Sequence, residues 1–370
     1  MVIYSSIYLL NILSGFVKKG QKKYIVYLVL ILLSLLSGTR YYMGGTDVYA
    51  YENVFKGVPS CIDVLAYIFS GVNNGVDINY EPGYLLLNSV IKDLGFNYFG
   101  FTLIISILFY FFMYQGLKPF VKEWSIVISI FMYKLMFYNT FISIRQGLTL
   151  AVFLYSIKYI INKQPIKYFM MCFILFYVHR ASLFLFPLYF VQYIPISKKI
   201  LIYYATAFFP TIAISGIVNF ENIIVNIISL IGYSEKSESW ATPIESISII
   251  HTLELYIIVG LVIYFYYKLD DKDPKQKIFI QFLLILIPIF TLCRDWLIFT
   301  RLKDYLVISY GILLAIICTN NTKRKSICVL IKYAVYIACF IGMIRYVLVF
   351  DGGVFMVYES FIFYFKSIFG

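Results

Sequence analysis

Residues 98–115 read YFGFTLIISILFYFFMYQ, a run of eighteen residues that contains no charged side chain. A helix that crosses the hydrocarbon core of a bilayer needs about 20 mostly apolar residues, with a range of roughly 17–25. The stretch therefore predicts a transmembrane helix. Eleven other stretches of similar apolar character accompany it. The twelve candidate helices lie near 2–17, 24–38, 98–115, 124–141, 146–162, 167–179, 182–196, 200–218, 248–267, 278–293, 303–319 and 327–349.

The composition of the whole chain agrees with this interpretation. Of its 370 residues, 61% are hydrophobic and only 14% are charged, whereas a soluble domain carries roughly 45–50% apolar and about 25% charged residues. A soluble core cannot hide this much apolar surface, because the fraction of surface that is buried on folding has a ceiling. We therefore predict an all-α polytopic integral membrane protein in which residues 1–370 form a single transmembrane domain. A secreted disulfide scaffold, a cytosolic enzyme and a disordered chain are excluded.

The net charge of +12 is distributed as short basic clusters between alternate pairs of candidate helices. This spacing indicates membrane topology rather than a surface for nucleic acid. If all twelve helices cross the membrane, the clusters share one side, which the positive-inside rule makes cytoplasmic. The other side then holds residues 39–97, residues 219–247 and the tail after residue 350. The basic clusters are Lys18/Lys19/Lys22/Lys23, Lys118/Lys122, Lys163/Lys167, Lys198/Lys199, Lys268/Lys272/Lys275/Lys277 and Lys323/Arg324/Lys325.

Arginine and lysine are not mixed along the chain. Only Arg324 falls in a cytoplasmic cluster, where Lys supplies nearly all of the charge. The guanidinium group of Arg is a planar fork that binds phosphate or carboxylate through two parallel hydrogen bonds, which Lys cannot do. The outer arginines either pair with outer carboxylates and lipid headgroups or form an anion site at the outer leaflet. They are Arg40, Arg145, Arg180, Arg294, Arg301 and Arg345.

The long outer segment, residues 39–97, carries two candidate carboxylates. Asp47 follows a Gly-Gly-Thr turn, and it either caps a short helix or takes part in chemistry. Glu81 directly precedes Pro82, which favours the start of a helix. The apolar stretch that follows is too short to span a bilayer, so residues 82–95 are predicted to form an interfacial or re-entrant helix. Glu81 then lies at the mouth of this helix, or it is a solvated loop carboxylate.

Polar residues also mark two breaks between apolar stretches. Arg145 and Gln146 begin a predicted helix. A cation is unfavourable at a helix N-terminus, so an anion is expected close to Arg145. His179 and Arg180 separate two further apolar runs. A lone histidine is most often a structural residue, and its arginine neighbour raises the possibility of a functional role.

A last polar cluster contains two arginines that are seven residues apart. Arg294 and Arg301 share a face if the segment between them is helical. Asp295 and Asp304 lie beside them in the sequence, and they are able to neutralise the two guanidinium charges. Tyr305 follows directly. The six cysteines of the chain include no C-x-x-C pair and no Cys/His ligand spacing, so no metal site is predicted.

Five short motifs follow one another along roughly residues 1–320. They are Arg40 with Gly-Gly-Thr-Asp47 and Tyr51, Glu81-Pro-Gly-Tyr84-x-Leu-Leu-Asn88, Arg145-Gln146, His179-x-Ala-Ser-Leu, and Arg301 with Tyr305. In this order they resemble the EpsG family of Wzy-type bacterial polysaccharide polymerases, which are found in O-antigen and capsule clusters. The resemblance implies a GT-C-like fold in the bacterial cytoplasmic (inner) membrane, with the active site on the outer side. It also implies undecaprenyl-diphosphate-linked oligosaccharide as the substrate, and membrane lipids and a chain-length regulator protein as partners.

A polymerase of this kind transfers a growing glycan from its lipid diphosphate to a hydroxyl group of an incoming repeat unit. The departing diphosphate requires positive charge, and the acceptor hydroxyl requires a proton acceptor. The candidates for the base are Asp47, Glu81 and His179. The candidates for binding the diphosphate are Arg40, Arg145, Arg294 and Arg301, and those for binding sugar are Gln146, Arg180 and Tyr305. No cofactor is expected, because arginine can supply the charge that a metal ion would otherwise provide.

Two other functions remain open from the sequence. A flippase for lipid-linked oligosaccharides would need charge along a path through the membrane, whereas the ionisable groups here gather mostly at one predicted edge. An outer-leaflet ligase, or another glycosyltransferase that uses lipid-phosphate sugars, is chemically close to a polymerase. A product assay separates these two enzymes. Gene neighbourhood or the glycan made by a deletion strain separates polymerase from flippase.

Overall fold

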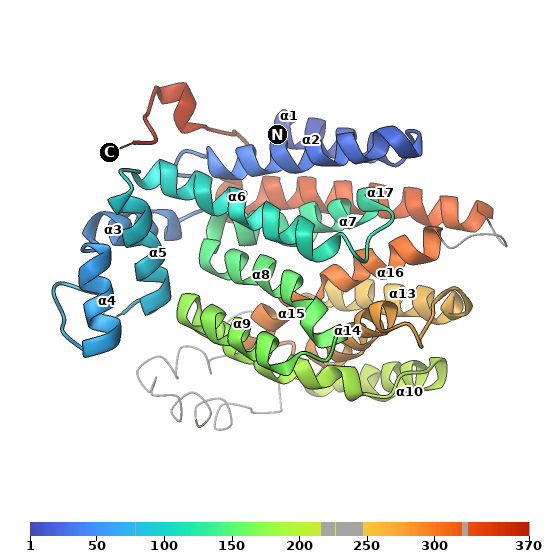
Figure 1. Cartoon of the computed structure of the whole chain (residues 1–370). Coiled ribbons are helices and arrows are strands. Elements are labelled where there is room, and N and C mark those ends of the chain that lie inside the picture. Colours follow the sequence, from blue (N-terminus) through green and yellow to red (C-terminus); the bar gives the residue numbers. More distant parts are fainter. Residues whose placement is uncertain (78, 216–225, 227–246, 320–324, 370) are drawn as a thin grey trace. The chain divides into compact units, whose positions relative to one another are not determined.

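The computed structural model describes all residues except 78, 216–225, 227–246, 320–324 and 370 (Figure 1). Within the described residues the secondary structure is helical, with no strand beyond two isolated β-bridges. The prediction of an all-α protein is therefore confirmed. The contacts within the chain group it into two compact units, each of which is described by itself. Unit 1 comprises Met1–Phe186 and Val329–Gly370, and unit 2 comprises Pro187–Cys328.

Unit 1 contains the first nine α-helices and most of the last one. Their bounds are α1 Val2–Ser14, α2 Lys19–Gly38, α3 Asp47–Gly57, α4 Cys61–Ser70, α5 Pro82–Asp93, α6 Tyr98–Leu117, α7 Trp124–Phe131, the π-helix η1 Met132–Ile142, α8 Ile144–Ile161, α9 Pro165–Val178 and α17 Lys325–Val349. Two short 3₁₀ helices follow α17, namely η5 Phe350–Gly353 and η6 Phe361–Tyr364. Helix α6 packs against α2 and α8, and α8 packs against α9. Buried aromatic side chains such as Phe101 and Phe153 fill the space between these helices.

Unit 2 contains fewer long elements. The 3₁₀ helix η2 Arg180–Tyr193 leads into it, and the elements that follow are α10 Lys198–Phe208, η3 Phe209–Ile214, α13 Ile249–Tyr264, η4 Tyr266–Lys268, α14 Pro274–Phe290, α15 Leu297–Leu306 and α16 Ile308–Thr319. Helix α14 packs against α10, α15 and α16, and most of its residues from Ile278 onward are buried. The predicted second outer loop, residues 219–247, lies almost entirely outside the described residues.

Six helices in the described part of the chain are long and apolar enough to cross a membrane. They are Gly20–Gly38, Tyr98–Leu117, Trp124–Ile142, Ile144–Ile161, Ile298–Thr319 and Ser326–Gly353. Six of the twelve predicted spans coincide with these helices. The others fall on shorter or 3₁₀ elements. Proline contributes to this shortening, because Pro187 lies inside η2, and Pro274 begins α14 while Pro288 lies near its end. The chain is thus an all-helical membrane protein, and the count of twelve spans stays a prediction.

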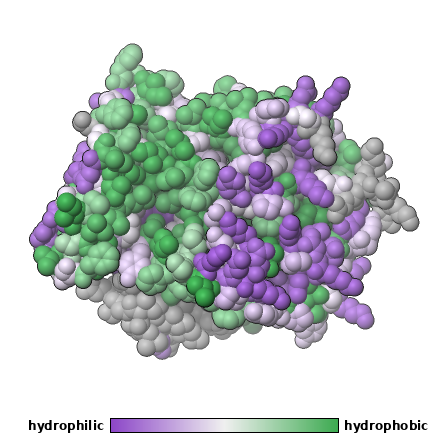
Figure 2. All heavy atoms as spheres, viewed as in Figure 1, coloured by the Kyte–Doolittle hydropathy of each residue, from purple (hydrophilic) through white to green (hydrophobic). Residues whose placement is uncertain are grey.

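Several helices of unit 1 expose large apolar side chains, as a surface in contact with lipid does. Ile31 on α2, Phe111 on α6 and Met170 on α9 are each more than half exposed. In Figure 2 hydrophobic side chains cover the face over α6. A water-facing surface rarely carries an apolar patch of this extent, so these faces fit a hydrocarbon environment.

Residues 39–97 fold into three short helices, α3, α4 and α5, where the sequence indicated short helices after Asp47 and at Pro82. Helix α5 packs against α3, α4 and α9 (Figure 1). The C-terminal tail returns to the same end of unit 1, because the backbone N–H of Tyr41 donates to the carbonyl oxygen of Glu359 and the N–H of Asn97 donates to that of Ile368. The predicted topology puts this segment and the tail on one side, and their contacts agree with that grouping.

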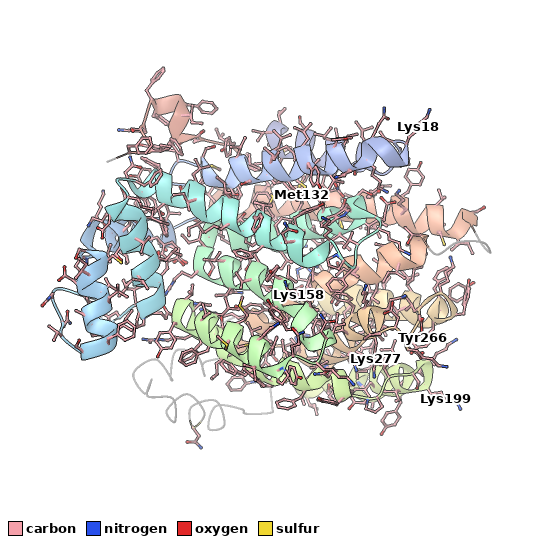
Figure 3. All side chains as sticks on the ribbon, in the orientation of Figure 1. Lys18, Met132, Lys158, Lys199, Tyr266 and Lys277 are labelled. Carbon is pink, nitrogen blue, oxygen red and sulfur yellow. The ribbon has the colours of Figure 1, made fainter. Side chains whose placement is uncertain are left out.

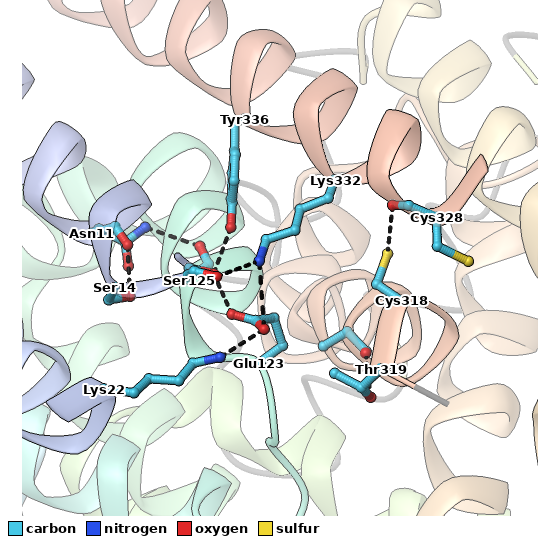
Figure 4. Close-up of polar contacts among 12 residues, drawn as sticks. Asn11, Ser14, Lys22, Glu123, Ser125, Cys318, Thr319, Cys328, Lys332 and Tyr336 are labelled. Carbon is cyan, nitrogen blue, oxygen red and sulfur yellow. Dashed lines mark hydrogen bonds and ion pairs between the residues drawn. The ribbon is translucent and has the colours of Figure 1, made fainter. Parts of the chain in front are cut away.

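Lysines collect at the ends of the unit 1 helices that lie away from α3, α4 and α5. Figure 3 shows Lys18 at the start of α2 and Lys158 in the last turn of α8; Met132, also labelled, is fully buried. Glu123 joins two elements here by accepting from Lys22 at 2.7 Å and lying 3.6 Å from Lys332 (Figure 4). We call this region the lysine end.

Candidate active site

At the opposite end of unit 1, Arg145 pairs with Glu81. The Nη1 atom of Arg145 lies 2.5 Å from Oε2 of Glu81. Only 7% of the Glu81 side chain and 20% of the Arg145 side chain are exposed. The solvated-loop interpretation of Glu81 is therefore wrong, because the carboxylate is buried against a cation. The two residues are 64 positions apart in the sequence, so the pair depends on the packing of α5 and α8.

The start of α5 fixes the position of Glu81. Glu81 occupies the N-cap position with extended backbone angles, and Pro82 begins the helix, where its missing N–H costs nothing. Gly83 allows α5 to approach the end of α9, because a Cβ atom there would lie 2.8 Å from the backbone oxygen of Tyr177. This close approach brings Glu81 to the residues that follow α9.

The first turn of α8 fixes the position of Arg145. The π-helix η1 ends at Ile142, and α8 begins two residues later. A π-helix is uncommon and often accompanies a functional site. Gly147 lets the first turn of α8 pack on η1, because a Cβ atom there would overlap the backbone oxygen of Asn139. The anion that the sequence required beside this N-terminal arginine is the carboxylate of Glu81.

His179 and Arg180 complete the surroundings of Glu81. The backbone N–H of Arg180 donates to Oε1 of Glu81 at 3.2 Å, and Nδ1 of His179 lies 3.8 Å from the same oxygen. His179 is 5% exposed and has extended backbone angles at the C-cap of α9. The two oxygens of Glu81 thus face different partners, since Oε2 faces the guanidinium group and Oε1 faces the imidazole ring.

Three tyrosine rings surround the guanidinium group of Arg145. Its Cζ atom lies 5.5 Å from the ring centre of Tyr51 and 5.3 Å from those of Tyr80 and Tyr84, which is within the range of cation–π attraction. Burial raises the pKa values of the Tyr80 and Tyr84 hydroxyls, and the positive charge of Arg145 opposes this shift. Both phenols are therefore neutral at physiological pH.

Several polar atoms of this cluster are buried without a hydrogen-bond partner. They are Nε of Arg145, the hydroxyl oxygen of Tyr84 and Oδ1 of Asn88. A buried polar atom without a partner costs about 1–3 kcal/mol. Such atoms are expected where a ligand supplies the missing partner.

Arg40 is the most deeply buried arginine of this end, with 3% of its surface exposed. Its Nη1 atom donates to the carbonyl oxygen of Ser37, while Nε and Nη2 have no hydrogen-bond partner. The guanidinium group borders a cavity of about 10 Å³ together with Asn139 and Thr140, and this is room for about one water molecule. A binding role of Arg40 toward diphosphate stays a prediction.

The other predicted residues of unit 1 lie close to this cluster. Asp47 begins α3 and is exposed; it contributes electrostatically to the environment of Tyr80. The cap interpretation of Asp47 needs correction, since Thr46 holds the N-cap position and makes no side-chain cap bond. Gln146 is fully buried in the first turn of α8.

Three predicted residues belong to unit 2 and are described within it. Arg294 lies in the turn after α14, with Nε 3.7 Å from Asp295, whereas Arg301 lies inside α15. The segment between the two arginines is therefore not one helix, and the shared face expected for them is absent. Tyr305 is 1% exposed on α15. Asp304 lies 3.5 Å from Lys303.

Sequence reasoning gave these tyrosines no role and missed a further acid. Tyr51 and Tyr84 stood in the motifs that resemble the family, and Tyr80 was indistinguishable among 36 tyrosines. Glu52 is also buried and accepts from the hydroxyl of Tyr42 at 2.8 Å. Within the described residues, no group of three or more His, Cys, Asp and Glu side chains is arranged to hold a metal ion.

The fold and this cluster define a class of protein, namely an all-helical membrane protein with a buried polar cluster. In this cluster an arginine, a glutamate and a histidine from three helix ends lie close together, and tyrosine rings surround the arginine. The sequence profile of the EpsG family matches residues 23–360. The chain belongs to this family, which is a family of Wzy-like polysaccharide polymerases. A search of curated proteins and a search of solved structures each found no match.

Proposed function

We propose that this protein is a Wzy-type polymerase that joins undecaprenyl-diphosphate-linked oligosaccharide repeat units into a surface polysaccharide. The reaction takes place at the outer face of the bacterial cytoplasmic membrane, within a GT-C-like arrangement of about twelve spans. Membership of the EpsG family supports the polymerase class. The observation that carries the proposal is the buried Arg145–Glu81–His179 cluster.

Arg145 is the residue that binds the diphosphate of the donor. Its Nη1 atom already binds one carboxylate oxygen, and its Nε atom is buried without a partner. A phosphate oxygen can accept from this free donor, because the guanidinium fork is suited to two parallel hydrogen bonds. As the bond between the anomeric carbon and the phosphate oxygen breaks, the electron pair moves to the diphosphate. Arg145 stabilises the charge that develops there.

Glu81 and His179 receive the proton of the acceptor hydroxyl. The acceptor oxygen forms its new bond to the anomeric carbon, and its proton passes to the carboxylate or the imidazole that lie 3.8 Å apart. Both groups are buried, so water competes poorly as the acceptor of the glycan. Asp47 remains a second candidate for the base, and Gln146 and Arg180 are candidates for sugar contacts. Diphosphate binding by Arg40, Arg294 and Arg301 and sugar binding by Tyr305 are parts of this proposal that rest on the sequence alone.

The experiment that tests this function measures the chain length of the surface glycan in a strain that lacks the gene. A polymerase deletion leaves single repeat units on the outer surface in place of a ladder of long chains, and the wild-type gene restores the ladder. Accumulation of lipid-linked units on the cytoplasmic side would identify a flippase instead. Long free chains that are not attached to their final carrier would identify a ligase.

A further inference from the structure

Beside the Arg145–Glu81 pair, unit 1 contains a cavity of about 330 Å³ that neither the sequence nor the family membership assigns. Small-molecule sites usually measure about 300–1,000 Å³, so the cavity has room for one ring-sized ligand. Its walls come from one face of α3, from the loop before α5 and from α5 itself. The lining residues are Ala50, Asn53, Val54, Gly57, Val58, Asp77, Tyr80 and Leu85.

The chemistry of the walls favours a neutral ligand that is rich in hydroxyl groups. The lining includes the carboxylate of Asp77 and the amide of Asn53, but no Lys or Arg, so a phosphate would meet negative charge without compensation. Oδ1 of Asp77 accepts from the backbone and side-chain nitrogens of Asn79. Among the described residues, its Oδ2 atom and the Asn53 amide make no hydrogen bond. They can pair with vicinal hydroxyl groups.

Tyr80 gives the cavity an aromatic wall. An aromatic face carries partial negative charge and attracts the polarised C–H groups of a sugar ring. Val54, Val58 and Leu85 supply further apolar surface. The lining thus combines an aromatic ring and apolar side chains with a carboxylate and an amide. This combination suits a pyranose, which has an apolar face and a rim of hydroxyl groups.

Tyr80 also joins the cavity to the candidate active site. Its ring centre lies 5.3 Å from Cζ of Arg145, and Glu81 is the next residue in the chain. A sugar ring in the cavity would therefore lie beside the reacting groups. We propose that this cavity is a subsite for one pyranose ring of the lipid-linked repeat unit, held by Asn53, Asp77 and Tyr80; the proposal rests on the polymerase function proposed above.

Gly57 offers a direct way to fill this subsite. A Cβ atom at Gly57 meets no other atom within 4 Å, and Gly57 lines the cavity, so Gly57→Leu adds apolar volume at the cavity wall. Gly20 at the start of α2 is equally open but lies at the lysine end, and Gly20→Leu is the matched control. The measurement is polymer formation by the purified full-length protein in nanodiscs. The substrate is the lipid-linked repeat unit extracted from the deletion strain.

For Gly57→Leu we expect KM to rise by about tenfold or more with kcat nearly unchanged, because excess volume in a pocket costs about 10–200-fold. Gly20→Leu should leave both constants at wild-type values. Asn53→Ala, at an exposed position, should raise KM about fivefold through one lost hydrogen bond. This variant tests the subsite if Gly57→Leu fails to fold. Wild-type KM in both Gly57→Leu and Asn53→Ala would overturn the subsite.

A second readout does not require turnover. The variant Asn53→Cys is labelled with a maleimide reagent, and the water-soluble oligosaccharide that mild acid releases from the repeat unit is added. The subsite predicts slower labelling of this position and unchanged labelling of Gly20→Cys. Absence of protection, together with wild-type KM in the cavity variants, would contradict the subsite. If the wild-type protein makes no polymer but the oligosaccharide still protects position 53, the subsite stands and the polymerase function is wrong.

Discussion

Each end of unit 1 buries a glutamate against a cation, Glu123 at the lysine end and Glu81 at the other, but the two do so in different ways. At the lysine end, Oε2 of Glu123 accepts from Lys22 and Oε1 accepts from Ser125 at 2.6 Å. Lys332 lies 3.6 Å from this carboxylate and donates to the carbonyl oxygen of Gly15 at 2.9 Å. The hydroxyl groups of Ser125 and Tyr336 are 2.6 Å apart (Figure 4). Every one of these groups has a partner.

In the Arg145–Glu81 cluster, by contrast, some buried polar atoms have no hydrogen-bond partner. Nε of Arg145 and the hydroxyl oxygen of Tyr84 are buried without hydrogen-bond partners. A network that is fully satisfied joins helices, whereas a network with open donors is prepared for a ligand. The comparison therefore indicates a structural role for Glu123, and it supports the role in a site that we propose for Glu81.

The largest expected effect is that of Glu81→Gln, which keeps the shape of the side chain and removes its charge. We expect the rate of polymer formation to fall by about 10²–10⁴, the usual contribution of a positioned acid or base. The measurement is polymer formation by purified protein with lipid-linked repeat units. Asp47→Asn, at an exposed carboxylate, is the comparison, and a larger loss in Asp47→Asn than in Glu81→Gln would move the base to Asp47.

Arg145→Lys tests whether Arg145 acts through the two parallel hydrogen bonds of its guanidinium group or only through its positive charge. The charge stays, but the parallel hydrogen bonds to phosphate are lost, so we expect a fall in rate of about 10²–10³. Lys22→Arg at the lysine end should leave polymer length unchanged, because Glu123 needs only a cation there. Arg324→Lys in the predicted cytoplasmic cluster is a further control. Normal chain length in Arg145→Lys, with protein level checked by immunoblot, would remove bidentate phosphate recognition from the mechanism.

Glu123→Gln tests the structural side of the comparison. Removing this carboxylate leaves two largely buried lysines without a counter-charge, and the free energy of unfolding should fall by about 3 kcal/mol. Thermal unfolding in detergent gives the measurement, as a lower Tm than that of the wild type. The polymer made per folded molecule should stay within about twofold of wild type. A wild-type Tm combined with short glycan chains would reverse the roles assigned to the two glutamates.

The smallest expected effect concerns the tyrosines around Arg145. Tyr51→Leu removes one ring and should weaken transition-state stabilisation by about 0.5–2 kcal/mol, the usual size of a cation–π contact. Tyr51→Phe keeps the ring and removes only the contact of the hydroxyl with the guanidinium group, so it should lose less kcat/KM than Tyr51→Leu. Equal losses in the two variants would show that the hydroxyl group, rather than the ring, matters at this position.

The sequence predicted the candidate site in part. It identified Glu81, Arg145 and His179 one by one, from a proline-initiated helix, an arginine at a helix N-terminus and a polar break between apolar runs. It also required an anion beside Arg145, which the structure supplies as Glu81. It gave no role to Tyr51, which stood only in a motif that resembles the family, and it did not identify Tyr80, because no local pattern shows which of the 36 tyrosines packs on an arginine.

By itself the sequence determined the environment of the chain and the positions of its long helices. Uncharged apolar stretches and alternating lysine clusters are local properties; the first favour transfer of a helix into lipid, and the second favour one orientation of the helices. Only the tertiary structure decided which residues meet. The 64-residue separation of Glu81 and Arg145, the approach of Gly83 to Tyr177 and the pairing of Glu123 with Lys332 all result from how helices pack. Packing depends on the shapes of two facing surfaces at once, which no single stretch of sequence contains.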